Sequence, residues 1–224
     1  MIRPLTDKTL SVVTDLNIIP DWNQLAVCVM ASVRGGVNLV QVRAKSLSPK
    51  RQQALAIKIV DLVGVHAQVV VNGDPEIAKA SGATGVHLPE EGTSISINDA
   101  RATLGHNAII GKSVHSTNAA IEAERDGADY IYFGTVFDSL SHPSGHTNGL
   151  TGVIKSSNAV SIPVIGIGGI NSENVRSVMN AGASGVAVIS AIIRRRDSYR
   201  AARTLKQAMS GGRSVAAYGA SKIE

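Results

Sequence analysis

The chain has 224 residues, of which 44% are hydrophobic and 17% charged, so it is long and apolar enough to bury the core of one globular domain. Its composition excludes a disordered or low-complexity chain, and no apolar run approaches the roughly 20 residues that span a bilayer. With a formal charge of +5, 3% aromatic residues and no secretory signal, we expect a cytoplasmic protein that binds a small anionic molecule, without membrane or nucleic-acid partners. A homo-oligomer is left open.

Eight short apolar runs alternate with longer stretches of helical spacing, which predicts a parallel sheet with helices between its strands. The predicted strands are residues 11–14, 39–42, 69–71, 85–88, 109–112, 130–133, 164–167 and 186–189. One predicted helix repeats apolar residues at the spacing of a single buried face, namely Leu55, Ile59, Leu62 and Val63. Asn171 and Ser172 are predicted to cap another helix, and Gly-Ala steps are predicted to end helices at residues 82–83, 127–128 and 182–183.

Eight strand–helix units in about 210 residues fit a single (β/α)8 TIM barrel, an α/β fold, with a doubly wound open sheet as the alternative. The open sheet is disfavoured because residues 14–16, Thr-Asp-Leu, stand where a dinucleotide-binding turn has glycines. We assign residues 1–210 to the barrel domain and residues 211–224 to a flexible C-terminal tail. In a barrel, the active site is expected on the loops that follow the strands.

Two features are expected to be structural. Cys28 is the single cysteine and lies in an apolar run, which predicts a buried core residue. Five arginines fall late in the chain and are predicted to form a solvated helix face, namely Arg194, Arg195, Arg196, Arg200 and Arg203.

Polar residues follow the second and third predicted strands. Gln41, Arg43 and Lys45 alternate, so they point to one side, toward the barrel mouth, where two cations and an amide predict an anion site. The alternative is an ordinary strand end with solvated charges. Asn72 offers an amide beside Gly73, and a plain turn explains this pair equally well.

The loops after the seventh and eighth strands predict a phosphate site. Gly168 and Gly169 follow the seventh strand and precede a helix, while Ile189 and Ser190 close the eighth. TIM barrels commonly bind phosphate at these two loops through backbone N–H groups.

Histidines supply candidates for proton transfer. Residues 134–152 form the longest irregular stretch, typical of a lid or binding loop, and contain His142 and His146. His87 and His115 end strands at the same mouth, or else are structural. No histidine or cysteine spacing predicts a metal site.

Together these loops resemble the thiamine-phosphate synthase and TenI family, over residues 11–209. The resemblance is carried by QVRAK (41–45), VNG (71–73), GVHLP (85–89), GKSVHS (111–116), DGADYIYFGTVF (126–137), IPVIGIGGI (162–170) and GASGVAVISAI (182–192). It implies a TIM barrel that binds hydroxyethyl-thiazole phosphate, with the phosphate on the loops of Gly168, Gly169, Ile189 and Ser190. The substrate-binding residues expected with it are Gln41, Arg43, Lys45, Asn72 and Ser113.

The family holds two kinds of enzyme. Its synthases join the thiazole phosphate to a pyrimidine pyrophosphate with Mg²⁺, whereas TenI members resemble tautomerases that aromatise a carboxythiazole phosphate. Gly73 and Gly92 replace the two carboxylates that a synthase uses for Mg²⁺, which needs hard oxygen ligands. Only displaced carboxylates remain as substitutes, namely Asp74, Glu90 and Glu91.

The residues of the sixth loop also depart from both patterns. His142 stands in place of the pyrophosphate-binding lysine of a synthase, and Thr135 in place of the acid–base histidine of a tautomerase. A hydroxyl of unperturbed pKa cannot act as an acid–base group at pH 7. The segments VNG, HLP and SVHS resemble TenI proteins.

Our first expectation is therefore a TenI-like enzyme of thiamine biosynthesis or salvage that needs no cofactor and no metal. Its candidate catalytic residues are His142, His115, Thr135 and Lys45. The alternatives are a thiamine-phosphate synthase with rearranged Mg²⁺ ligands and a non-catalytic protein that binds thiazole or thiamine phosphate.

Overall fold

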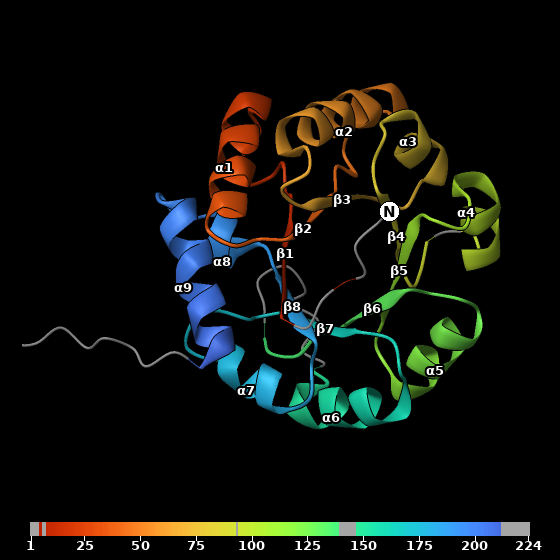
Figure 1. Ribbon diagram of the computed structural model, residues 1–224, viewed down its shortest axis with the longest axis vertical. Coiled ribbons are helices and arrows are strands. Elements are labelled where there is room, and N and C mark those ends of the chain that lie inside the picture. Colours follow the sequence, from red (N-terminus) through yellow and green to blue (C-terminus); the bar gives the residue numbers. More distant parts are fainter. Residues whose placement is uncertain (1–4, 6–7, 93, 139–146, 212–224) are drawn as a thin grey trace, which may run out of the picture.

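The strands form a closed parallel barrel in chain order, with β8 paired to β1 (Figure 1). The computed structural model describes residues 5, 8–92, 94–138 and 147–211. The strands are β1 (Thr9–Val13), β2 (Leu39–Val42), β3 (Gln68–Asn72), β4 (Gly85–Leu88), β5 (Ile109–Val114), β6 (Tyr130–Phe133), β7 (Val164–Ile167) and β8 (Gly185–Val188). The predicted TIM barrel is confirmed, and the open-sheet alternative is wrong.

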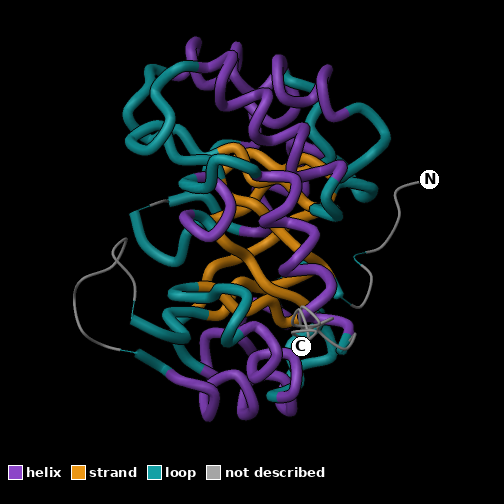
Figure 2. Tube along the Cα trace, turned by 90° about the vertical axis from the view of Figure 1, so that its left-hand side faces the viewer, coloured by secondary structure: helices purple, strands orange, loops and turns teal. Residues whose placement is uncertain are grey.

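Helices surround the strands on the outside of the barrel (Figures 1 and 2). They are α1 (Trp22–Arg34), α2 (Pro49–Val63), α3 (Pro75–Ala80), α4 (Ile97–Leu104), α5 (Thr117–Arg125), α6 (Gly149–Ala159), α7 (Val175–Asn180), α8 (Ser190–Ile193) and α9 (Ser198–Ser210). The single turn α8 leads into α9, which packs against α1 and α7 and so completes the ring.

Buried side chains form two cores, one on each face of the sheet. The outer core lies between the strands and the helices. The inner core fills the barrel and contains Val13, Leu39, Val70, Ile109, Tyr130, Tyr132, Ile165 and Ala187. Burial on both faces explains why the strands read as nearly continuous apolar runs.

Several predicted local features are confirmed and two are wrong. Glycines with positive φ follow α3, α5 and α7, as the Gly-Ala steps predict. The N-cap of α7 is Asn174 and not Asn171 or Ser172, because the chain first makes a turn in which the Asn171 Oδ1 accepts the Glu173 N–H, and the helix starts only at Val175. Leu62 is 40% exposed despite the buried spacing, because it lies beside a groove between α1 and α2.

Of the two features expected to be structural, one is confirmed and the other is confirmed in part. Cys28 is buried with its Sγ 3.0 Å from the Ser198 Oγ, and burial raises the pKa of its thiol. All five arginines are exposed, but only Arg200 and Arg203 lie on a helix, α9, whereas Arg194, Arg195 and Arg196 lie in the turn between α8 and α9. Within the described ranges, no helix is long and apolar enough to cross a membrane. The predicted tail falls, after Gly211, outside the described residues.

Candidate functional site

The carboxyl ends of the strands gather at one end of the barrel, which we call the mouth. Gln41, Asn72, His87 and Ser113 are the last inward-facing residues of β2, β3, β4 and β5, and hydrogen bonds join them in two pairs. Each pair joins neighbouring strands, and in each the second residue lies two positions beyond the register partner of the first, since Gln41 is level with Val70 and His87 with Gly111. The structure thus brings together three of the predicted substrate-binding residues, Gln41, Asn72 and Ser113.

Gln41 and Asn72 form a buried amide pair. The Gln41 Nε2 donates to the Asn72 Oδ1 at 2.8 Å, and Gln41 is only 3% exposed. Its Oε1 is buried and has no hydrogen-bond partner in the described part of the chain. Because an unpaired buried acceptor is costly, this atom is suited to receive a donor from a bound molecule or water.

Arg43 and Lys45 follow β2 at the same end of the barrel. The backbone of Arg43 is fixed by Thr14, whose Oγ1 accepts from the Arg43 N–H at 2.8 Å and donates to the Arg43 carbonyl at 3.1 Å. Arg43 is half-buried and Lys45 is exposed, and neither forms an ion pair within the described ranges. Their charges are therefore available to an anion.

The loops after β7 and β8 present free backbone donors. The N–H groups of Gly168, Gly169 and Ser190 donate to no acceptor among the residues that the structure describes. Gly168 and Gly169 have φ of +102° and +63°, which side chains rarely adopt, and Ile189 precedes the first turn of α8. This arrangement has the donors expected of a phosphate site.

Thr135 lies directly beside this loop. A Cβ placed on Gly168 would lie 2.6 Å from the Thr135 Cγ2, so the threonine methyl faces the glycine backbone. The segment is anchored by Val136 N–H on the Ile167 carbonyl and by Phe137 N–H on that of Gly168, at 2.9 and 3.1 Å. The structure thus places Thr135 beside the phosphate loop, and its catalytic role remains a prediction.

Of the four predicted histidines, the structure describes two, the buried His87 and the exposed His115. His115 is exposed and paired through Nδ1 with Glu90, whose Oε1 also accepts the His115 N–H at 3.3 Å. His142 and His146 lie outside the described residues. Lys112 donates from Nζ to the Pro89 carbonyl at 2.8 Å, and burial lowers the pKa of its ammonium group.

A buried polar cluster lies below Ser113, and only its histidine was noticed in the sequence. His87 is 1% exposed, with Nε2 2.9 Å from the Ser113 Oγ and Nδ1 3.0 Å from the Tyr130 hydroxyl. Burial, and to a lesser degree the charge of Lys112, lowers the pKa of His87 to about 3. The alternation Val86-His87-Leu88 is the signal that could have placed this ring inside the barrel.

The carboxylates present do not fit a preassembled Mg²⁺ site. The Asp74 Oδ1 accepts the N–H groups of Glu76 and Ile77 at the start of α3, and Glu90 is held by His115. No group of three potential ligands occurs within residues 8–92, 94–138 and 147–211. We therefore assign no residue to a metal.

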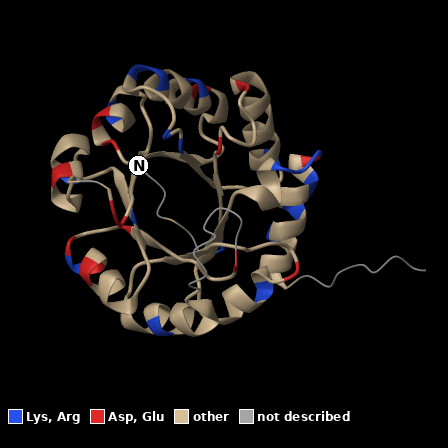
Figure 3. Ribbon diagram, turned by 180° about the vertical axis from the view of Figure 1, so that it is seen from behind, with Lys and Arg blue, Asp and Glu red and all other residues tan. Residues whose placement is uncertain are grey.

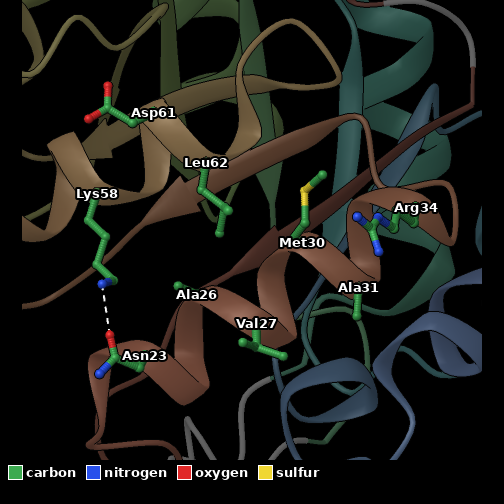
Figure 4. A pocket seen from close by; sticks show the side chains of 9 residues that line it. All are labelled: Asn23, Ala26, Val27, Met30, Ala31, Arg34, Lys58, Asp61 and Leu62. Carbon is green, nitrogen blue, oxygen red and sulfur yellow. Dashed lines mark hydrogen bonds between the residues drawn. The ribbon is translucent and has the colours of Figure 1, made fainter.

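Two surface features lie away from the mouth. A groove of about 690 Å³ separates α1 from α2 on the outside of the barrel, with Val27 and Leu62 on its sides and the Lys58 Nζ bound to the Asn23 Oδ1 at 2.8 Å (Figure 4). Residues of both charge signs are spread around the ring of helices (Figure 3). Charge alone therefore does not single out Arg43 and Lys45 from the other cations, and what sets them apart is their position at the strand ends.

Known proteins resemble this chain along most of its length. The family model of thiamine monophosphate synthase, TMP-TENI, matches residues 10–192. Thiamine-phosphate synthases of Clostridium novyi (strain NT) and Chloroflexus aurantiacus are each 36% identical, over 88% and 93% of this chain and 96% of their own. A solved thiamine phosphate pyrophosphorylase from Pyrococcus furiosus superposes with a TM-score of 0.81 at 32% identity, covering 92% of this chain and 96% of that structure.

These relatives bear the name of the synthase and not of a tautomerase, so the expected TenI-like branch is not supported. The family match covers more than half of the chain, and the relatives agree with it. The chain is an enzyme of thiamine biosynthesis and belongs to the thiamine monophosphate synthase (TMP-TENI) family.

Proposed function

We propose that this protein is a thiamine-phosphate synthase, which joins hydroxyethyl-thiazole phosphate to hydroxymethyl-pyrimidine pyrophosphate. The observation that carries the proposal is the position of Thr135 against Gly168, where a tautomerase of this family would have its acid–base histidine. Related proteins named thiamine-phosphate synthase support the same reaction.

The chemistry of the synthase makes small demands on proton transfer. The thiazole nitrogen attacks the methylene carbon of the pyrimidine, a C–N bond forms, and the C–O bond to pyrophosphate breaks. The pyrophosphate leaves with the bonding electron pair, and the thiazole nitrogen has no proton to lose. An enzyme for this step must orient two substrates and hold a highly charged leaving group, without a general base on the nucleophile.

The mouth offers separate places for the two anionic substrates. The free N–H groups of Gly168, Gly169 and Ser190 suit the phosphate of the thiazole. Arg43 and Lys45 follow β2, three strands around the closed barrel from β7, and suit the pyrophosphate. The Gln41 Oε1, next to them, suits an N–H donor of the pyrimidine.

Replacing Arg43 with Gln is expected to raise KM for the pyrimidine pyrophosphate by about 10-fold or more, because a charge-assisted hydrogen bond contributes about 1.5–3 kcal/mol. Steady-state kinetics with each substrate varied in turn measures this. Arg125→Gln removes an exposed arginine at the end of α5 and is the matched control, expected to change neither KM. Equal effects of the two substitutions would contradict the role of Arg43.

The ligand-free protein is expected to bind no Mg²⁺ tighter than about 1 mM, because Asp74 and Glu90 are held in helix and histidine contacts and the described residues contain no group of three potential ligands. Isothermal titration of Mg²⁺ into the protein, with and without inorganic pyrophosphate, measures this. Submillimolar binding to the protein alone would show that Asp74, Glu90 or Glu91 forms the site predicted for displaced ligands.

The activity itself is tested by incubating the purified protein with both substrates and following thiamine phosphate. Formation of the product supports the synthase. A protein that binds the thiazole phosphate and forms no product, yet isomerises a carboxythiazole phosphate, would be a tautomerase.

A further inference from the structure

Five side chains extend the mouth into the barrel interior, and we call them the interior chain: Ser113, His87, Tyr130, Tyr132 and Ser11. The His87 ring joins the Ser113 hydroxyl to the Tyr130 hydroxyl at 2.9 and 3.0 Å. The Tyr130 and Tyr132 rings are in contact, with centroids 5.4 Å apart, and the Tyr132 hydroxyl lies 2.5 Å from the Ser11 Oγ. Ser113 is the member of the interior chain at the mouth.

The ring of His87 is neutral at any physiological pH. It is fully enclosed, and burial together with the charge of Lys112 lowers its pKa to about 3. Both tyrosines stay protonated, since burial raises the pKa of each phenol. One nitrogen of His87 therefore carries a proton and the other accepts one, and each hydroxyl of the interior chain carries one proton.

Which nitrogen of His87 is protonated depends on whether every buried proton of the interior chain finds an acceptor. If Nδ1 carried the proton, Tyr130 would accept it and would have to pass its own proton through Tyr132 to Ser11. The Ser11 hydroxyl is fully buried and has no acceptor besides Tyr132 in the described part of the chain, so one proton would be left unpaired. Buried donors are rarely left unpaired, because the desolvation penalty is then not recovered.

The opposite direction pairs every buried proton. Tyr130 donates to the His87 Nδ1, and the His87 Nε2–H donates to the Ser113 Oγ. Ser11 donates to Tyr132, and the Tyr132 hydroxyl donates to that of Tyr130, with which it is hydrogen-bonded. The one proton that remains belongs to Ser113, at the accessible end. The direction in which the hydrogen bonds of the interior chain donate thus decides whether Ser113 offers a donor or an acceptor to a ligand.

We propose that His87 is a positioning residue whose Nε2–H fixes Ser113 and turns the serine hydroxyl proton toward the substrate. Ser113 then recognises an unprotonated acceptor atom, such as a ring nitrogen or a phosphate oxygen. The effect on turnover rests on the proposed synthase function, whereas the proton arrangement does not.

The effect on turnover is tested by a double-mutant cycle with His87→Leu, Ser113→Ala and both together. His87→Leu is expected to lower kcat/KM for thiamine phosphate formation by about 10-fold, the value of one oriented hydrogen bond, and to cause no further loss in the Ser113→Ala background. His87→Gln keeps an Nε2 donor and is expected to retain kcat/KM within about threefold. Thermal unfolding of each variant separates these effects from loss of fold.

Two outcomes would overturn the positioning role. One is an equal loss from His87→Leu with and without the Ser113 hydroxyl, and the other is a loss from His87→Gln as large as that from His87→Leu. A purely structural histidine would produce either of them.

The proton arrangement is tested without turnover, by ¹⁵N NMR of the imidazole nitrogens. The chain has six histidines, and His87 is assigned by the signals that His87→Gln removes. A protonated Nε2 and a bare Nδ1 are expected at every pH from 5 to 8 in the ligand-free protein. A protonated Nδ1 would overturn the proposal. Wild-type protein without synthase activity would instead refute the proposed function, while this spectrum still decides the proton arrangement.

Discussion

The Gln41→Leu variant is expected to form thiamine phosphate with a kcat/KM about 100-fold below that of the wild type. The substitution removes the Oε1 acceptor offered to the substrate and also leaves the Asn72 Oδ1 without its donor. Two buried hydrogen-bonding groups at about 1–1.5 kcal/mol each account for a loss of this size. Steady-state kinetics measures it.

Gln68→Leu is the matched control for this variant. Gln68 begins the neighbouring strand β3, so it lies at the end of the barrel opposite the mouth. The control is expected to change kcat/KM by no more than about twofold, even where it lowers thermal stability. Comparable losses in the two variants would show that Gln41 acts through the stability of the barrel and not through the substrate.

Acid is expected to destabilise the protein through His87. The unfolded chain binds a proton at this ring near pH 6.5, whereas the folded chain does so only near pH 3. Between these values the unfolded state binds more protons, so the free energy of unfolding falls as pH falls, by up to about 1.4 kcal/mol per pH unit. Below about pH 3 this contribution no longer changes.

His87→Gln isolates this contribution because the side chain cannot titrate, while its amide offers a donor and an acceptor in place of the two ring nitrogens. Between pH 7 and pH 4.5 the wild type is expected to lose roughly 2–3 kcal/mol more stability than the variant, measured by urea unfolding at each pH. Parallel curves for the two proteins would show that His87 is protonated in the folded state and would contradict its buried, neutral position.

The fold could be predicted because its signals are local. The runs at residues 39–42, 85–88, 130–133 and 164–167 coincide with β2, β4, β6 and β7, since strands buried on both faces must be apolar throughout. Helix ends were marked by glycines that adopt positive φ. Leu62 was misplaced because helical spacing does not reveal whether a neighbouring helix covers that face.

The site could be predicted only in part because its contacts are distant in sequence. The positions of Gln41 and Asn72 at the ends of predicted strands indicated the mouth, whereas Ser113 was expected from the family resemblance alone. Tyr130 and Tyr132 read as ordinary core residues, and their hydroxyl partners lie 43 and 121 residues away. Such pairings follow from barrel closure and not from local pattern.

A few positions do not identify the reaction of this chain. Gly73, Gly92 and Thr135 depart from the family patterns, and they led to the expectation of a tautomerase. The likeness of the whole chain to proteins named thiamine-phosphate synthase supports the alternative. Thr135 fits that alternative, because the synthase step removes no proton from its nucleophile.

The most direct test of the proposed synthase function is the stoichiometry of turnover with both substrates in Mg²⁺-containing buffer. The reaction is monitored by ³¹P NMR. A synthase is expected to accumulate thiamine phosphate and pyrophosphate one for one from hydroxyethyl-thiazole phosphate and hydroxymethyl-pyrimidine pyrophosphate. Unchanged substrates, together with isomerisation of a carboxythiazole phosphate by the same preparation, would contradict it.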